Sequence, residues 1–151
     1  MYHGTTEAGY QIRPLTTKGA KYITCMERDV YMGGFERTSV LNSDQPVVIT
    51  EDYISAVRVG SLGYSAQCNY GVQVKPEFLH RMVEDFGIDC LYIVWLDNDS
   101  KHVCNKAQEI ANILEMFGAK NVVVHQGTTE PKHEHDDDII TVIKGHQTWT
   151  I

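Results

Sequence analysis

The chain lacks several features that would assign it to particular classes of protein. No apolar run approaches the ~20 residues that span a bilayer, and Met1-Tyr2-His3-Gly4 does not begin a signal-peptide pattern, so we expect neither a membrane span nor secretion. The four cysteines include no C-x-x-C pair, which argues against a zinc ribbon or a disulfide framework. A Gly-x-x-x-x-Gly-Lys-Ser/Thr loop is also missing, which excludes a P-loop motor. These absences favour a cytoplasmic protein with reduced cysteines.

Charge and composition narrow the functional classes further. The net charge of −7 argues against coating nucleic acid through bulk electrostatics, although it leaves room for a local basic path. An acidic balance also suits a site that collects carboxylate ligands for a metal. With 151 residues, 42% of them hydrophobic, the chain is long enough to bury a substantial core.

The stretch around which the chain is organised is residues 91–96, six apolar residues in a row. This pattern predicts a strand buried on both faces, as in the interior of a parallel sheet. Periodicity, caps and glycine stops predict further elements: buried strands at 47–50 and 121–125, helices at 51–59, 76–86, 101–117 and 136–143, and an edge strand at 146–151. The alternation of strands and helices predicts a parallel, three-layered α/β fold.

The first part of the chain has a different pattern. Short β-like runs without helical periodicity predict a small antiparallel β-rich piece, at 9–15, 20–25 and 30–35. The turn-rich run 41–46 ends in a proline and is the best candidate boundary. We therefore expect an N-terminal β-rich segment over residues 1–45 and an α/β domain over residues 46–151.

Some single residues carry weaker expectations. Thr50 is predicted to cap the 51–59 helix, and Cys104 is predicted to be a small buried hydrophobe on the 101–117 helix. Three histidines near a polar loop could bind a transition metal, although the polarity of the loop favours solvated side chains: His125, His133 and His135.

Three carboxylates follow two of the predicted strands. Glu51 comes after residues 47–50, and Asp97 and Asp99 come after residues 91–96. If the two strands are neighbours, the three acids converge where ligands bind in open α/β sheets. Hard oxygen ligands of this kind suit Mg²⁺ or Mn²⁺. Each acid also has a structural interpretation, because carboxylates are common in the first turn and at the N-cap of a helix.

The order of these elements resembles a known family. A strand followed by Glu51 and a helix, and then a strand followed by Asp97-Asn98-Asp99 and a helix, resembles the Toprim domain of primases, topoisomerases and some nucleases. The chain is most similar to the RNA-polymerase region of phage-type DNA primases and primase-helicases. The segments that match the motifs of that region are Arg13-Pro14-Leu15, residues 20–24, residues 46–51, residues 55–58, residues 127–132 and residues 136–139.

The resemblance implies a fold, an activity and a role for each matching residue. The fold would be a Toprim-type, Rossmann-like parallel sheet. Glu51, Asp97 and Asp99 would bind Mg²⁺ or Mn²⁺ and carry catalysis, with Glu51 supporting acid–base chemistry. Arg13 and Lys21 would contact nucleotide phosphates or the nascent strand. The activity would be nucleotidyl transfer that makes short RNA primers from NTPs on single-stranded DNA, in a bacterium or a phage-infected cell.

The chain also departs from the family pattern. Ser55 stands where the family often has an acid, Glu130 stands where an aspartate usually precedes the proline, and Ser100 begins a segment that usually starts with glycine. The chain has no paired cysteines to build a zinc-binding template reader and no phosphate loop to build a helicase motor. The resemblance therefore implies a separate zinc-binding module and a replicative helicase as partners.

Two other functions remain open from the sequence. A Toprim-type nuclease would use the same acids to direct water at a phosphodiester, although the upstream Arg13 and Lys21 favour the primase. A non-catalytic Toprim subunit would bind nucleic acid within a replication complex, which the missing template reader makes credible.

Overall fold

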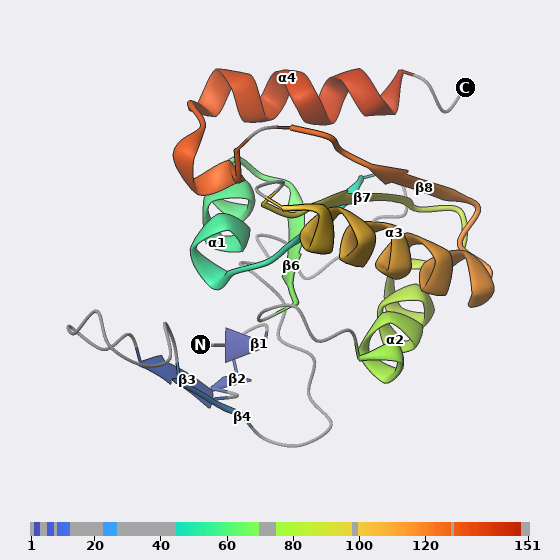
Figure 1. The fold of residues 1–151 in the computed structure, drawn as a ribbon, viewed down its shortest axis with the longest axis horizontal. Coiled ribbons are helices and arrows are strands. Elements are labelled where there is room, and N and C mark those ends of the chain that lie inside the picture. The colour runs from blue at the N-terminus through green and yellow to red at the C-terminus, as the bar shows by residue number, and fades with distance from the viewer. Residues whose placement is uncertain are drawn as a thin grey trace.

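The structure is a computed structural model, and it describes residues 2–3, 6–7, 9–12, 23–26, 45–69, 75–97, 100–127 and 129–148 (Figure 1). Its main feature is a four-stranded parallel sheet. The strands are β5 (Val47–Thr50), β6 (Ser65–Cys68), β7 (Leu91–Trp95) and β8 (Asn121–Val124), in the order β6-β5-β7-β8. Every pairing is parallel, so the predicted Rossmann-like α/β fold is confirmed.

Helices cover both faces of this sheet. They are α1 (Tyr53–Ser61), α2 (Pro76–Phe86), α3 (Lys101–Met116) and α4 (Asp136–Gln147), with a short 3₁₀ helix, η1 (Pro131–His133), before α4. Buried residues of α2 and α3 pack on one face, while those of α1 and α4 pack on the other. Figure 1 shows α4 on the side of the sheet opposite α2 and α3. The result is the three-layered arrangement predicted from the sequence.

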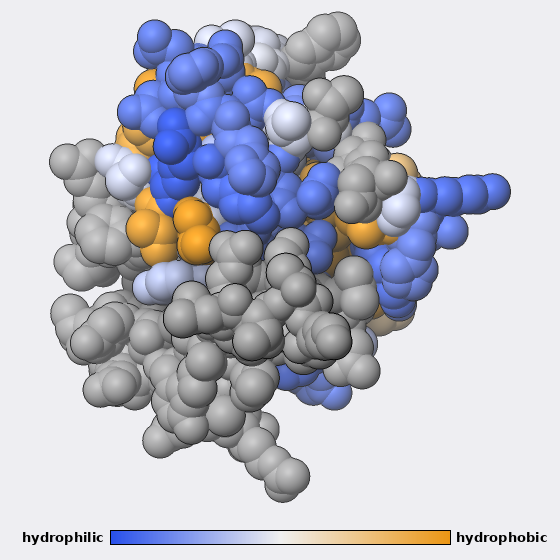
Figure 2. Space-filling view, turned by 60° about the vertical axis from the view of Figure 1, so that its left-hand side comes forward, coloured by the Kyte–Doolittle hydropathy of each residue, from blue (hydrophilic) through white to orange (hydrophobic). Residues whose placement is uncertain are grey.

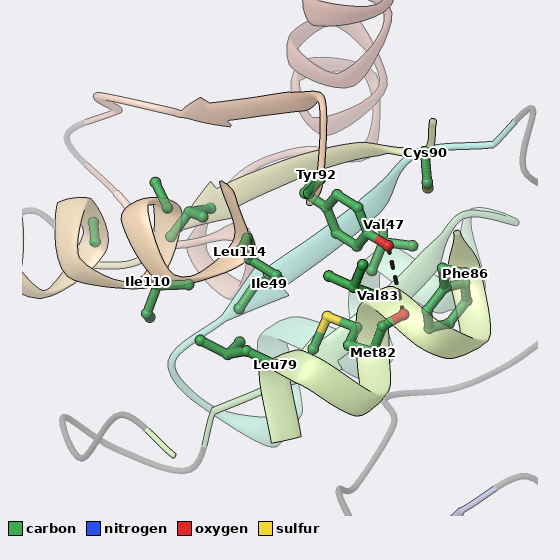
Figure 3. Close-up of a cluster of buried hydrophobic side chains, with 14 of the residues drawn as sticks. Val47, Ile49, Leu79, Met82, Val83, Phe86, Cys90, Tyr92, Ile110 and Leu114 are labelled. Carbon is green, nitrogen blue, oxygen red and sulfur yellow. Dashed lines mark hydrogen bonds between the residues drawn. The ribbon is translucent and has the colours of Figure 1, made fainter. Parts of the chain in front are cut away.

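The strand at the centre of the sequence prediction is also central in the sheet. Every residue of β7 is buried, as expected for a strand with a helix layer on each side. On the α2–α3 face, its Tyr92 packs with Val47 and Ile49 of β5 (Figure 3). The Tyr92 hydroxyl donates a hydrogen bond of 2.8 Å to the carbonyl of Gly87, which satisfies the one polar atom of this buried ring.

The helix boundaries follow local sequence signals. Pro76 lies in the first turn of α2, where its missing amide hydrogen costs nothing. Gly87 ends α2 and Gly118 follows α3, with φ of 92° and 96°, values that favour glycine. The Ser100 hydroxyl accepts a hydrogen bond from the Val103 amide and caps α3. These positions were predicted to within a residue or two.

Four local predictions were wrong. Asp52, and not Thr50, caps α1, because the Thr50 hydroxyl turns to the carbonyl of Asp52 while the Asp52 carboxylate accepts the Ser55 amide. Cys104 is exposed, because the buried face of α3 runs through other residues. Strand β8, at one edge of the sheet, is only half-buried. Residues 146–147 continue α4 and do not begin a strand.

The N-terminal strands pair apart from this sheet. Strands β3 (Gly9–Ile12) and β4 (Ile23–Met26) are antiparallel, and the predicted β-rich piece as a whole stays a prediction. A shorter antiparallel pair, β1 (Tyr2–His3) and β2 (Thr6–Glu7), precedes them. The predicted run at 30–35 lies outside the described residues. The division of the chain at residue 45 stays a prediction.

The described surface is mainly hydrophilic on the face shown in Figure 2, with hydrophobic residues in small patches. The large apolar side chains that are exposed lie on separate elements: Ile54, Ile88 and Met116. Single exposed apolar residues are normal for a globular protein and indicate no interaction surface. No helix among the described residues is long and apolar enough to cross a membrane.

Candidate functional site

The carboxyl ends of β5 and β7 form a topological switch point. The two strands are neighbours, with Thr50 opposite Trp95. The helix that follows β5 packs on one face of the sheet, and the helix that follows β7 packs on the other. The chain therefore leaves the two strands in opposite directions, and the crevice between such strand ends is where open α/β sheets bind ligands.

Two of the predicted site residues lie at this point. Glu51 directly follows β5, and Asp97 comes two residues after β7; both side chains are half-buried. The sheet thus brings them to the same edge, as the sequence predicted. Asp99, Arg13 and Lys21 lie outside the described residues. Within the described ranges, no three His, Cys, Asp or Glu side chains are grouped closely enough to hold a metal.

The donor set nevertheless fits a hard divalent cation. Mg²⁺ is commonly held by one or two carboxylates, with waters and substrate phosphates completing its coordination. Glu51 and Asp97 supply two carboxylates from adjacent strand ends, and both keep part of their surface accessible. The described residues therefore fit Mg²⁺ or Mn²⁺ bound together with a phosphate-bearing ligand better than a fully protein-enclosed ion.

A buried ionic cluster lies beside Glu51, on the α1 side of this edge. We call it the Asp52 cluster; its members are Asp52, Ser55, Glu130 and Lys132. The Lys132 ammonium donates to Asp52 Oδ2 at 2.6 Å and also contacts Glu130 Oε2. The Ser55 hydroxyl lies 3.3 Å from Asp52 Oδ2 and 3.4 Å from Glu130 Oε2. The Glu130 side chain is only 4% exposed. The cluster joins the start of α1 to the segment around η1.

The charges of this cluster are strongly coupled. Burial alone would raise the pKa of Asp52, but hydrogen bonds from Glu130, Lys132 and the Ser55 amide lower it to about 2. Burial and the neighbouring Asp52 raise the pKa of Glu130 to about 7. Burial would lower the pKa of Lys132, yet its two carboxylate partners raise it. At neutral pH Asp52 and Lys132 are therefore a charged pair, and Glu130 keeps its proton to a higher pH than an ordinary glutamate does.

A pocket lies on the other side of Asp97, between the ends of β7 and β8 and helix α3. It has a volume of about 210 Å³, and we call it the β7–β8 pocket. Leu96, Val103, Ala107 and Val124 form its apolar wall. Its polar lining comprises Asp97, Cys104, Gln108, His125 and Gln126. The lining is thus mixed, with four apolar and five polar residues, and is more polar than that of typical small-molecule sites, which are mainly apolar with a few polar groups.

Two histidines connect the end of β8 to α4. Nδ1 of His125 lies 3.2 Å from Nε2 of His146, and the His125 ring also packs against Trp95 at a centroid distance of 4.5 Å. Burial, followed by the neighbouring His146, lowers the pKa of His125, and burial lowers the pKa of His146. This contact fixes His125 by packing, while His133 and His135 are exposed. A shared metal site for the three predicted histidines is not formed.

The sequence reasoning missed most of this surrounding structure. The Asp52-x-x-Ser55 spacing is that of a capped helix start, so Asp52 could have been recognised as the cap. Nothing in the local sequence indicates that Lys132, eighty residues later, pairs with it. Gln108 and Gln126 had no signal either, because they meet only through the packing of α3 on the sheet.

Comparisons with protein-family models, with curated proteins and with solved structures found no match to this chain.

Proposed function

We propose that this protein is a metal-dependent nucleotidyltransferase of the DNA primase type, which joins NTPs into short RNA primers on single-stranded DNA. The observation that supports it best is the switch point between β5 and β7, because Glu51 follows β5 directly and Asp97 comes two residues after β7. It agrees with the order of motifs that resembles the Toprim region of phage-type primases. Asp99, Arg13 and Lys21 complete the proposed site from outside the described residues.

In this proposal, the chain's own residues would hold the metal, orient the NTP and share the charge of its phosphates. Asp97, with Asp99, would hold Mg²⁺ or Mn²⁺ and so orient the phosphates of an NTP. When bound, the metal would neutralise the charge of the pyrophosphate leaving group. Glu51 would accept the proton of the attacking 3′-hydroxyl or hold the metal, and Arg13 and Lys21 would share the phosphate charge.

The Asp52 cluster has a supporting part in this proposal. Ser55 and Glu130 stand where the family pattern often has acids, and here both are bonded within the cluster. The Lys132 ammonium already pairs with the carboxylates of Asp52 and Glu130. The cluster would thus hold the segment that carries Glu51, while the metal would bind at Glu51, Asp97 and Asp99.

The test is to incubate the protein with single-stranded DNA, labelled NTPs and Mn²⁺, and to separate the products on a gel. Asp97→Asn and Glu51→Gln should each reduce labelled oligonucleotides on the order of 100-fold or more. The matched control is Asp89→Asn, because Asp89 precedes β7 at the opposite edge of the sheet and pairs with Lys120 at 2.7 Å.

Each other result points to a different function. Undiminished synthesis in Asp97→Asn would remove this residue from the site and overturn the proposed mechanism. Shortened DNA in place of primers would favour the Toprim-type nuclease. DNA that is bound but neither copied nor cut would favour a non-catalytic subunit, and a zinc-binding module or a helicase would then be sought as its partner.

A further inference from the structure

We propose that the β7–β8 pocket binds the base of a nucleotide. The inference rests on the proposed function for the identity of the nucleotide, whose phosphates would lie at Glu51 and Asp97. It adds where the base is held and which side chains contact it. The argument depends on the place of the pocket, its size and the chemistry of its lining.

The pocket adjoins the proposed phosphate site. Asp97 lines it and also follows β7 at the switch point, so one side chain joins the pocket to the proposed phosphate site. Gln126 reaches it from the segment after β8, the next strand in the sheet. A nucleotide with its phosphates at the strand ends would therefore place its base toward α3.

The size of the pocket fits one ring system. Its volume of about 210 Å³ is below the roughly 300–1,000 Å³ of sites that enclose drug-sized ligands. A whole nucleotide would not fit inside it, but a base would, with its sugar at the mouth. Val103 and Ala107 present an apolar surface from α3, against which the flat face of a ring can pack.

The charge of the lining excludes a phosphate from the pocket itself. One carboxylate, Asp97, lines it, and the lining contains no lysine or arginine. An anionic group inside would be repelled without a bound cation, whereas a neutral ring with N–H groups would be accepted. This separates the base end of the ligand from its phosphate end.

The polar side chains of the lining match the edge of a base. Side-chain amides both donate and accept hydrogen bonds, and Gln126 is exposed at the end of β8. Gln108 donates from its amide nitrogen to Asn112 at 3.0 Å, which orients its carbonyl oxygen as an acceptor. The His125 ring adds an aromatic surface that the contacts with Trp95 and His146 hold in place.

Cys104 provides a reporter within the native protein. It is exposed and lines the pocket, whereas Cys68 and Cys90 are buried. Alkylation by iodoacetamide, followed at the Cys104 peptide by mass spectrometry, can be measured without metal in the presence of adenosine, guanosine, cytidine or uridine. At least one nucleoside, at about twice its dissociation constant, should slow alkylation of Cys104 about threefold. Ribose 5-phosphate, which lacks a base, should give no protection.

Two variants test whether the protection comes from the pocket. Ala107→Met fills the apolar wall and should abolish protection. If this buried substitution prevents folding, Gln126→Ala tests the same contact from an exposed position and should weaken nucleoside binding about tenfold. The matched control is Gln45→Ala, which removes an exposed glutamine before β5, at the other edge of the sheet.

The outcomes separate this inference from the proposed function. Nucleoside protection of Cys104 in a wild-type protein that makes no primers would support the base site and count against the primase. Primer synthesis without protection of Cys104 by any nucleoside would overturn the base site and leave the primase intact. Protection that is equal in wild type and Gln126→Ala, with Ala107→Met folded and also protected, would likewise overturn it.

Discussion

The two sides of the sheet's carboxyl edge differ in how they hold polar groups. On the α1 side, the Asp52 cluster closes three ionisable side chains against one another, and each carboxylate contacts the Lys132 ammonium. On the α3 side, Asp97 lines an open pocket whose other polar groups are neutral amides, a thiol and a histidine. One side satisfies its charges internally, and the other leaves hydrogen-bonding groups facing a space.

This difference predicts which side resists substitution and which side has room for a ligand. A buried charge that loses its partner is costly, so the Asp52 cluster resists change and fixes the start of α1. A pocket with accessible amides has no such constraint and can exchange water for a ligand. Of the proposed metal ligands, Glu51 is next to Asp52 in the chain and Asp97 lines the pocket. The following predictions test the comparison, beginning with the largest expected effect.

Removing the lysine of the Asp52 cluster should be severely destabilising. Lys132→Met leaves Asp52 and Glu130 buried without their cation, and breaking a buried pair in this way costs about 3–5 kcal/mol. Urea-induced unfolding measures the change. Lys120→Met is the control, because its exposed pair with Asp89 contributes about 0–1 kcal/mol. Equal effects of the two substitutions would show that the Asp52 cluster contributes no more stability than the exposed pair of Lys120 and Asp89.

Beside the β7–β8 pocket, adding one methyl group at Gly127 should disturb the packing of His125. An alanine Cβ at Gly127 would lie 2.6 Å from Nε2 of His125, whose ring is held by Trp95 and His146. We expect Gly127→Ala to cost about 1–3 kcal/mol, as overpacking does. Gly145→Ala is the control: it meets nothing within 4 Å in α4 and should stabilise by about 0.5 kcal/mol. An unaffected Gly127→Ala protein would mean that the ring is free to move.

The two sides should also respond to pH in opposite directions. The pKa of Glu130 is raised from 4.5 to about 7, so the folded state binds more protons in this range and loses stability as the pH rises through it. The lowered pKa values of His125 and His146 mean that the unfolded state binds more protons below pH 6.5, so stability falls as the pH drops.

The measurement is the free energy of unfolding between pH 5 and 8, to which Glu130 and the two histidines should contribute with opposite dependence on pH. Glu130→Gln should abolish the loss on the alkaline side and keep the loss on the acid side, and His146→Phe should weaken the loss on the acid side. Identical pH profiles for wild type and Glu130→Gln would mean that Glu130 is ionised throughout and that the Asp52 cluster is not coupled as described.

Much of the fold could be predicted because its signals are local. The apolar run of β7, the positions of Pro76 and Gly87, and the spacing of Val103, Ala107 and Ile110 on α3 each depend on neighbours within a few residues. The errors arose where local signals compete. Thr50 and Asp52 are both residue types that cap helices, and the Asp52-x-x-Ser55 spacing, which favours Asp52, was outweighed by the position of Thr50 at the end of the strand.

The sequence by itself determined the α/β class, the main elements of the sheet and helix layers, and the position of Glu51 and Asp97 after two strands. The tertiary structure decided that these strands are neighbours, that Lys132 pairs with Asp52, and that α3 leaves a pocket beside Asp97. The physical reason is range: periodicity and capping act within a turn or a strand. Ion pairs between distant residues and the space between packed layers exist only once the layers have come together.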